Sequence, residues 1–198
     1  YEGTKLKLGT SEAHIHPICG ETCTHLDANG VPQHPPVVWQ SLNYASEYSS
    51  GYYYLKDTLT LTTTWKPADG LHLCLAGHNV EAAGNFDAIT VGVYSSDLNN
   101  LINTSISLTD CEPEGTTGKI THTSGTGRGV YIPYSYGLNQ LIMYGGSITG
   151  NNAGDKDGGG VAIYNGWKHY NFTMYGGSIK GNIGKNGGGV YISCGYVE

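Results

Sequence analysis

The side chains best suited to chemistry lie close together near the start of the chain. Residues 14–34 read HIHPICGETCTHLDANGVPQH, with two cysteines and four of the chain's eight histidines. Two thiolates and two imidazoles suit tetrahedral Zn²⁺, and metal binding supplies folding energy to a segment too polar to form its own core. We therefore expect a zinc site here. Its preferred ligands are Cys19, Cys23, His25 and His34, with His16 as the substitute.

A disulfide is the alternative for the same segment. Cys19 and Cys23 lie four positions apart, which is not the standard C-x-x-C spacing of many zinc sites. In an oxidising compartment the two cysteines would instead bond to each other and leave the histidines on the surface. The sequence leaves zinc and disulfide both open.

Aromatic side chains form a second set of candidates, toward the C-terminus. Exposed aromatic rings stack on sugar rings or on another protein. The alternative is that tyrosines form rows that only stabilise the surface of a sheet. The candidate ligand-binding residues are Tyr164, Trp167, His169 and Tyr170.

Carboxylates for cleaving a polysaccharide are few. A lyase needs carboxylates that hold Ca²⁺ beside a basic residue, and a glycosidase needs two carboxyl groups about 5 to 9.5 Å apart. Asp155 and Asp157 lie in a loop two residues longer than its counterpart around Lys185, so we expect no stacked pair there. The other candidate carboxylate is Asp110, and the one arginine, Arg128, has no acidic neighbour in the equivalent repeat. We therefore expect no enzyme.

An internal repeat indicates which elements hold these residues. MYGGSITGN begins at Met143 and MYGGSIKGN at Met174, 31 residues later, with eight of nine letters identical. GGGVAIYNG and GGGVYISCG follow them, and more diverged copies precede them. Aligning Leu73, Leu108, Met143 and Met174 gives about four units of 31–35 residues. Repeats too short to bury their own apolar face are typical of a solenoid.

Each unit holds about three short runs of alternating apolar residues, separated by Gly or Asn. Three strands per unit wound into parallel sheets predict an all-β parallel β-helix, whose successive coils lie about 4.8 Å apart. The paired glycines would form corners with positive φ, and Asn151 and Asn182 would stack as an amide ladder. The expected interior columns are Leu73, Leu108, Met143 and Met174; Val80, Ile120, Ile148 and Ile179; and Val130, Val161 and Val190.

The composition of the sequence indicates two segments and argues against some classes of function. Residues 1–50 are expected to form a small irregular His/Cys-rich cap, and residues 51–198 the β-helix, whose stack begins within residues 53–65. Only 13% of residues are charged and the net charge is −6, which argues against nucleic-acid binding. No apolar run reaches the roughly 18 residues of a membrane helix. Because Tyr1 is not an initiator Met, we expect a mature or excised segment.

Three further cysteines lie in the repeats. Cys74 and Cys111 fall on adjacent coils but two positions apart in register, so we do not expect them to pair. Cys194 lies near the end of the last unit, and its state stays open.

The order of these motifs resembles the large secreted surface proteins of gut-dwelling Gram-positive bacteria. HPICGETCTH, GYYYLKDTLTL, LHLCLAGHNV, SISLTDC and MYGGSITGN carry the resemblance, which covers the chain from about His14. The GGSI-type units are also similar to repeats of chlamydial polymorphic outer-membrane proteins. The resemblance implies a right-handed β-helix in a secreted or cell-surface, adhesin-like protein.

Our expectation is thus a non-enzymatic, extracellular structural protein. The last unit, Gly187 to Val197, is not followed by a polar capping segment, so copies would stack head to tail into filaments; the alternative is that the chain is part of a longer protein. Its partners would be itself, or glycans or proteins of a host or microbial surface. The alternatives are a carbohydrate-binding module and a polysaccharide-degrading β-helix enzyme.

Overall fold

The structure is a computed structural model that describes residues 14–17, 36–45, 50–97, 99, 101–111, 116–165 and 171–194. These residues form strands, turns and loops, with no helix among them. None of the described residues therefore belongs to a helix that could span a membrane. The all-β class expected from the sequence is confirmed.

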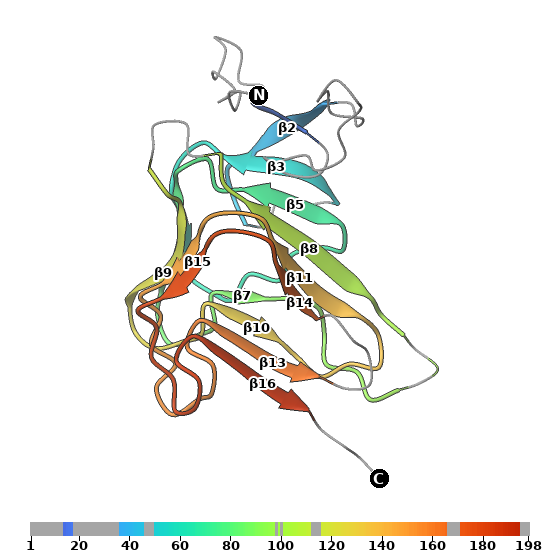
Figure 1. Ribbon diagram of the computed structural model, residues 1–198, viewed down its shortest axis with the longest axis vertical. Coiled ribbons are helices and arrows are strands. Elements are labelled where there is room, and N and C mark those ends of the chain that lie inside the picture. Colours follow the sequence, from blue (N-terminus) through green and yellow to red (C-terminus); the bar gives the residue numbers. More distant parts are fainter. Residues whose placement is uncertain are drawn as a thin grey trace.

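The strands form three sheets (Figure 1). The seven-stranded sheet contains, in spatial order, β1 (His14–Pro17), β2 (Pro36–Leu42), β3 (Gly51–Leu55), β5 (Leu71–Cys74), β8 (Thr104–Thr109), β11 (Asn139–Met143) and β14 (Phe172–Met174). The five-stranded sheet contains β4 (Leu59–Leu61), β6 (Asn79–Ala83), β9 (Lys119–Ser124), β12 (Ser147–Thr149) and β15 (Ser178–Lys180). The four-stranded sheet contains β7 (Ile89–Thr90), β10 (Val130–Ile132), β13 (Val161–Asn165) and β16 (Val190–Cys194). Apart from β1 with β2, all these pairs are parallel.

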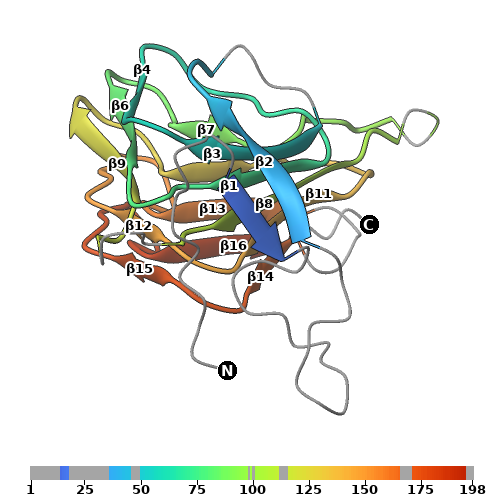
Figure 2. The same ribbon diagram turned by 90° about the horizontal axis from the view of Figure 1, so that it is seen from above.

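The chain visits the three sheets in rotation. β5, β6 and β7 form one repeat, and each of the next three repeats again places one strand in each sheet. β3, β4 and a bridge from Trp65 to Ile89 start the series, as expected for residues 53–65. Seen from above, the strands of the five-stranded sheet lie along one side of the molecule (Figure 2). This arrangement is compatible with the expected β-helix.

The predicted register is confirmed. The three columns of the sequence alignment pair residue by residue: Leu73, Leu108, Met143 and Met174; Val80, Ile120, Ile148 and Ile179; and Val130, Val161 and Val190. Most of these side chains are buried. The prediction is wrong for the burial of Met174 and Val190, which are 41% and 38% exposed. Both belong to the last repeat, so a neighbouring strand covers them on one side only.

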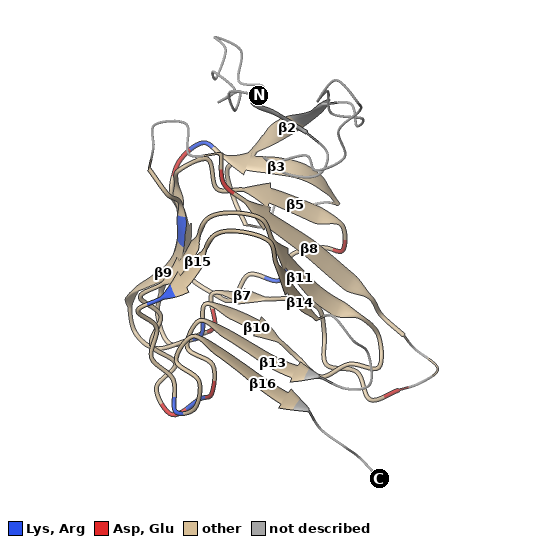
Figure 3. Cartoon of the chain, in the orientation of Figure 1, with Lys and Arg blue, Asp and Glu red and all other residues tan. Residues whose placement is uncertain are grey.

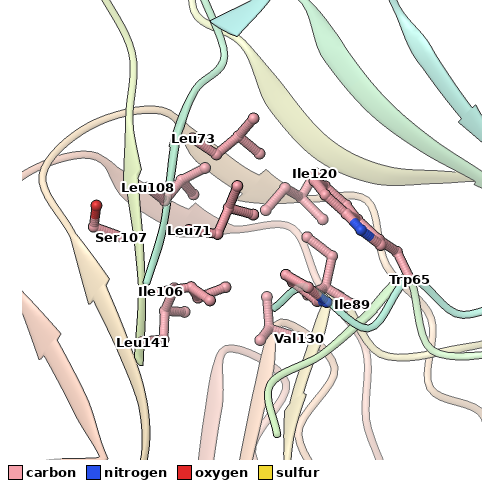
Figure 4. A pocket seen from close by; sticks show the side chains of 11 residues that line it. Trp65, Leu71, Leu73, Ile89, Ile106, Ser107, Leu108, Ile120, Val130 and Leu141 are labelled. Atoms are coloured by element: carbon pink, nitrogen blue, oxygen red, sulfur yellow. The ribbon is translucent and has the colours of Figure 1, made fainter. Parts of the chain in front are cut away.

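The interior between the sheets is filled by side chains. Buried residues of all three sheets form one apolar cluster. The void at its centre, between Leu71, Ile120 and Val130, measures about 10 Å³ (Figure 4). That volume is at the lower limit for one water molecule.

Glycine shapes the corner after β11 and β14. Gly146 and Gly177 occupy equivalent positions and have φ of +79° and +88°, as expected for the paired glycines. A Cβ atom on Gly177 would lie 2.6 Å from the carbonyl oxygen of Gly146. The corner therefore requires glycine for its backbone angle and for the close approach of the next repeat.

The predicted asparagine ladder is also present. Asn151 Nδ2 donates to Asn182 Oδ1 at 2.9 Å, and the Asn151 backbone N–H donates to the same oxygen at 3.0 Å. Asn151 Nδ2 further donates to the carbonyl oxygen of Ile120, one repeat earlier, at 3.1 Å. One side chain thus links three consecutive repeats.

The segment before residue 50 contributes β1 and β2 to the seven-stranded sheet. β2 pairs in parallel with β3, and β1 pairs antiparallel with β2 at the edge. Trp39 and Leu42 are buried. A separate cap with a boundary near Ser50 stays a prediction.

Candidate functional site

Most of the predicted zinc ligands lie outside the described residues. These are Cys19, Cys23, His25 and His34, whereas His16 belongs to β1. Among the residues that the structure describes, no three His, Cys, Asp or Glu side chains gather as a metal site. The zinc site and the alternative disulfide both stay predictions.

Of the four aromatic candidates, the structure places Tyr164, while Trp167, His169 and Tyr170 lie outside the described part of the chain. Tyr164 lies on the outer face of β13 between Tyr131 and Tyr191, with ring centroids 5.7 and 5.8 Å away. We name these three residues the tyrosine row. Ala162 occupies the register position between Tyr131 and Tyr191, so Tyr164 packs diagonally against both.

The rings of the tyrosine row pack against one another. Tyr131 and Tyr164 meet edge to face at 78°, and Tyr164 is tilted by 53° from Tyr191. Such geometry stabilises aromatic pairs and does not form a flat platform. Burial raises the pKa of the Tyr131 and Tyr164 hydroxyls, which are therefore neutral at pH 7. The row is suited to supporting the sheet.

A buried ion pair lies beneath one end of the row. Arg128 Nη2 and Nε donate to the two carboxylate oxygens of Asp87 at 2.8 and 3.0 Å, and the backbone N–H of Arg128 donates as well, at 3.0 Å. The guanidinium lies 3.8 Å from the ring centroid of Tyr131. Lys156 Nζ reaches Asp87 at 3.4 Å. The prediction that Arg128 has no acidic neighbour is wrong.

The register explains this pair. Val130 is opposite Ile89, so Arg128 is opposite Asp87, two residues earlier in each repeat. When DAITV, which begins at Asp87, is aligned with RGVYI, which begins at Arg128, the aspartate and the arginine fall at the same position, so the pair can be read from the sequence. The guanidinium of Arg128 is hydrogen-bonded to Asp87 and packs against the ring of Tyr131. Arg128 therefore has a structural role and is poorly placed to act as a base or to bind an anion.

The three candidate carboxylates are not brought together. Asp110 is buried after β8, where its oxygens accept the backbone N–H groups of Gly77 at 2.7 Å and Gly118 at 2.6 Å. Asp155 and Asp157 lie in the loop between β12 and β13, at a different corner. There Asp157 accepts from Asn186 Nδ2 at 2.7 Å. Asp110 thus joins successive repeats, and Asp155 and Asp157 stay on the surface.

A flatter aromatic pair lies outside the four ligand-binding candidates, among the tyrosines expected to form rows on the surface of a sheet. Tyr144 and Tyr175 stack nearly parallel, with centroids 5.2 Å apart and 12° between the planes. Tyr175 is 72% exposed. Both tyrosines follow the repeated methionine, so the phrase MYGG was the available signal.

The last described repeat presents an apolar surface, which we name the terminal face and define as Met174, Val190 and Ile192. Their in-register neighbours Met143, Val161 and Ile163 are buried, whereas Ile192 is 58% exposed. The strands of this repeat, β14, β15 and β16, are the outermost strands of the three sheets.

Comparisons with known proteins identify no relative of this chain. No family model matches the sequence, and no curated protein or solved structure is significantly similar to it. The resemblance to bacterial surface proteins therefore stays a prediction.

Proposed function

We propose that this chain is a right-handed parallel β-helix that serves as a secreted or cell-surface, adhesin-like structural protein and assembles head to tail. The β-helix is supported by three features: rotation of the chain through three sheets, in-register stacking, and one shared apolar core. A structural role is supported by the apolar cluster that fills the space between the three sheets in the described part of the chain.

The observation that carries assembly is the terminal face. Apolar side chains that continue the core columns are exposed there, beside the outermost strands of all three sheets. Unpaired strand edges and exposed apolar patches are templates for another chain. The strands of the seven- and four-stranded sheets carry no Lys, Arg, Asp or Glu, so charge does not protect their edges (Figure 3).

The partner proposed for this face is a second copy of the chain. At the opposite end, β4 is the outermost strand of the five-stranded sheet, and the Trp65 bridge lies outside β7 in the four-stranded sheet. These two parallel edges would accept β15 and β16 of another molecule, whereas in the seven-stranded sheet β2 and β1 already cover the corresponding edge of β3. Because the two contacting surfaces differ, the contact is heterologous and extends into a filament unless rotation closes a ring.

Ile192→Glu is expected to weaken self-association by at least about tenfold, because a carboxylate would be buried in the contact. Ile102→Glu is the matched control, since it makes the same change at an isoleucine that is 41% exposed in the loop between β7 and β8, away from the outermost strands. Sedimentation across a concentration series and electron microscopy measure the effect. A wild-type chain that stays monomeric at every concentration would contradict head-to-tail assembly.

Carbohydrate binding is the second candidate function, favoured by the stacked pair Tyr144 and Tyr175. The exposed ring of Tyr175 offers a face for a sugar. We expect Tyr175→Ala to weaken glycan binding roughly tenfold. Tyr44→Ala, which removes another exposed tyrosine from a distant strand end, should leave binding unchanged. A glycan array identifies the sugar and titration calorimetry measures the loss; an array without any bound glycan would exclude this candidate.

A further inference from the structure

Two cysteine side chains meet on the outer face of the seven-stranded sheet. Cys74 ends β5, and Cys111 follows β8 by two residues. Their sulfur atoms are 3.6 Å apart, as two thiols rather than a disulfide. The predicted offset of two positions is correct, because Cys74 is opposite Thr109. The irregular chain after Thr109 nevertheless brings the second sulfur into contact.

The two thiols differ in their surroundings. Cys74 is fully buried in a small cluster with Trp39, Tyr54 and Ala76, and Cys111 packs half-buried against this cluster. Burial, followed by the hydrogen bond with Cys111, raises the pKa of the Cys74 thiol well above its ordinary value. External reagents therefore reach Cys111 first, and Cys74 is protected until a partner sulfur is beside it.

We propose that Cys74 and Cys111 are a disulfide-forming pair that locks two consecutive repeats together, with a small-molecule disulfide such as oxidised glutathione as the oxidant. The Cys111 thiolate attacks one sulfur of the oxidant, forms a mixed disulfide and releases one glutathione thiolate. The Cys74 thiol then loses its proton to solvent, and its sulfur attacks the Cys111 sulfur and displaces the second glutathione thiolate. Two protein thiols are oxidised, and one glutathione disulfide is reduced to two thiols.

The required movement is small. A disulfide bond is about 2.05 Å long, so the sulfurs must approach by roughly 1.5 Å from their present separation. Cys111 lies outside the hydrogen-bonded strand, so its backbone can adjust without breaking the ladder between β5 and β8. The bond would close a loop of 37 residues' separation between adjacent repeats. This inference stands independently of the proposed function, because it concerns one molecule in solution.

The test is oxidation of the full chain followed by peptide mapping. Trypsin leaves both cysteines in one peptide, between Lys56 and Lys119, because Lys66 precedes a proline, whereas cleavage after Glu81 separates them. After incubation with oxidised glutathione and alkylation under denaturing conditions, we expect a linked peptide pair that joins Cys74 to Cys111. It should disappear after reduction. Alkylation of both cysteines, or a glutathione left on Cys111, would overturn the proposal.

Stability gives a second, independent measurement. A variant with Cys19, Cys23 and Cys194 replaced by serine keeps only the proposed pair. Oxidation should raise its thermal midpoint by several degrees, since cross-linking restricts the unfolded chain, and dithiothreitol should reverse the rise. Adding Cys111→Ser to this variant should abolish the response. An equal shift in both variants would show that the oxidant acts elsewhere and would overturn the proposal, as would the absence of a shift.

Discussion

Asp87→Ala is expected to lower the free energy of unfolding by about 3–5 kcal/mol, because it leaves the buried guanidinium of Arg128 without its carboxylate. Lys156 also approaches Asp87, but its side chain is half exposed, so its ammonium group stays solvated in the variant. Urea denaturation at pH 7 measures the loss. Asp155→Ala, an exposed carboxylate of a nearby loop, should change the value by no more than about 0.5 kcal/mol.

The double variant Asp87→Ala with Arg128→Met distinguishes the loss of the ion pair from a nonspecific loss of stability. Removing both charges leaves no uncompensated ion, so we expect it to recover much of the stability lost in Asp87→Ala. A double variant as unstable as the single one would contradict the role of the pair.

The same carboxylate makes stability depend on pH. Burial acts to raise the pKa of Asp87, but the hydrogen bonds and charge of Arg128, with a contribution from Lys156, lower it below the ordinary value. A carboxyl group with a depressed folded pKa stabilises the fold above its unfolded pKa of about 3.9. That stability is lost as the pH falls below about 4 and through the folded pKa. Asp87→Ala should therefore show a shallower loss of stability in acid than the wild type.

The second large effect is expected in the core column of Met143. Met143→Ala should cost about 2–5 kcal/mol, because this side chain is fully buried. Met174→Ala is the matched control, since it makes the same change at the in-register position one repeat later, where the side chain is 41% exposed. In dilute monomer it should cost no more than about 1 kcal/mol.

Concentration distinguishes the two methionine variants further. If copies stack through the terminal face, Met174→Ala will also weaken assembly, whereas equal costs for the two variants in dilute monomer would contradict the exposure of Met174. Chemical denaturation in dilute solution and light scattering in concentrated solution provide the two measurements.

The sequence was sufficient for the register of the repeats. Identical phrases around Met143 and Met174 fix which residues are opposite each other, and the paired glycines and Asn151 have the expected roles. Pattern alone assigns equivalent positions, but it does not show which of them are exposed. The exposure of Val190, at a position that is buried one repeat earlier, follows from its place in the stack.

The side-chain contacts were harder to predict, for a physical reason. Asp110 is of a residue type that can act as a catalytic acid. The sequence does not show that its two oxygens accept hydrogen bonds from the backbone N–H groups of Gly77 and Gly118; this depends on the path of the backbone. Cys111 lies beyond its strand, where register no longer determines direction, so its contact with Cys74 was not expected. Asp87 and Arg128 were within reach of the alignment, but the repeats there are diverged.

Paired residues of neighbouring repeats are 28 to 41 positions apart in the sequence, which has a consequence for how the chain folds. Leu73 and Leu108 are 35 residues apart, and Met143 and Met174 are 31 apart. The entropy lost on closing each such loop is therefore nearly the same at every step, since it grows only with the logarithm of loop length. Once one pair of repeats has docked, each following repeat adds to an existing template at similar cost, as in other nearest-neighbour arrays. We expect folding to spread outward from the repeats around β8 and β11, which are covered on both sides, with β14–β16 joining last.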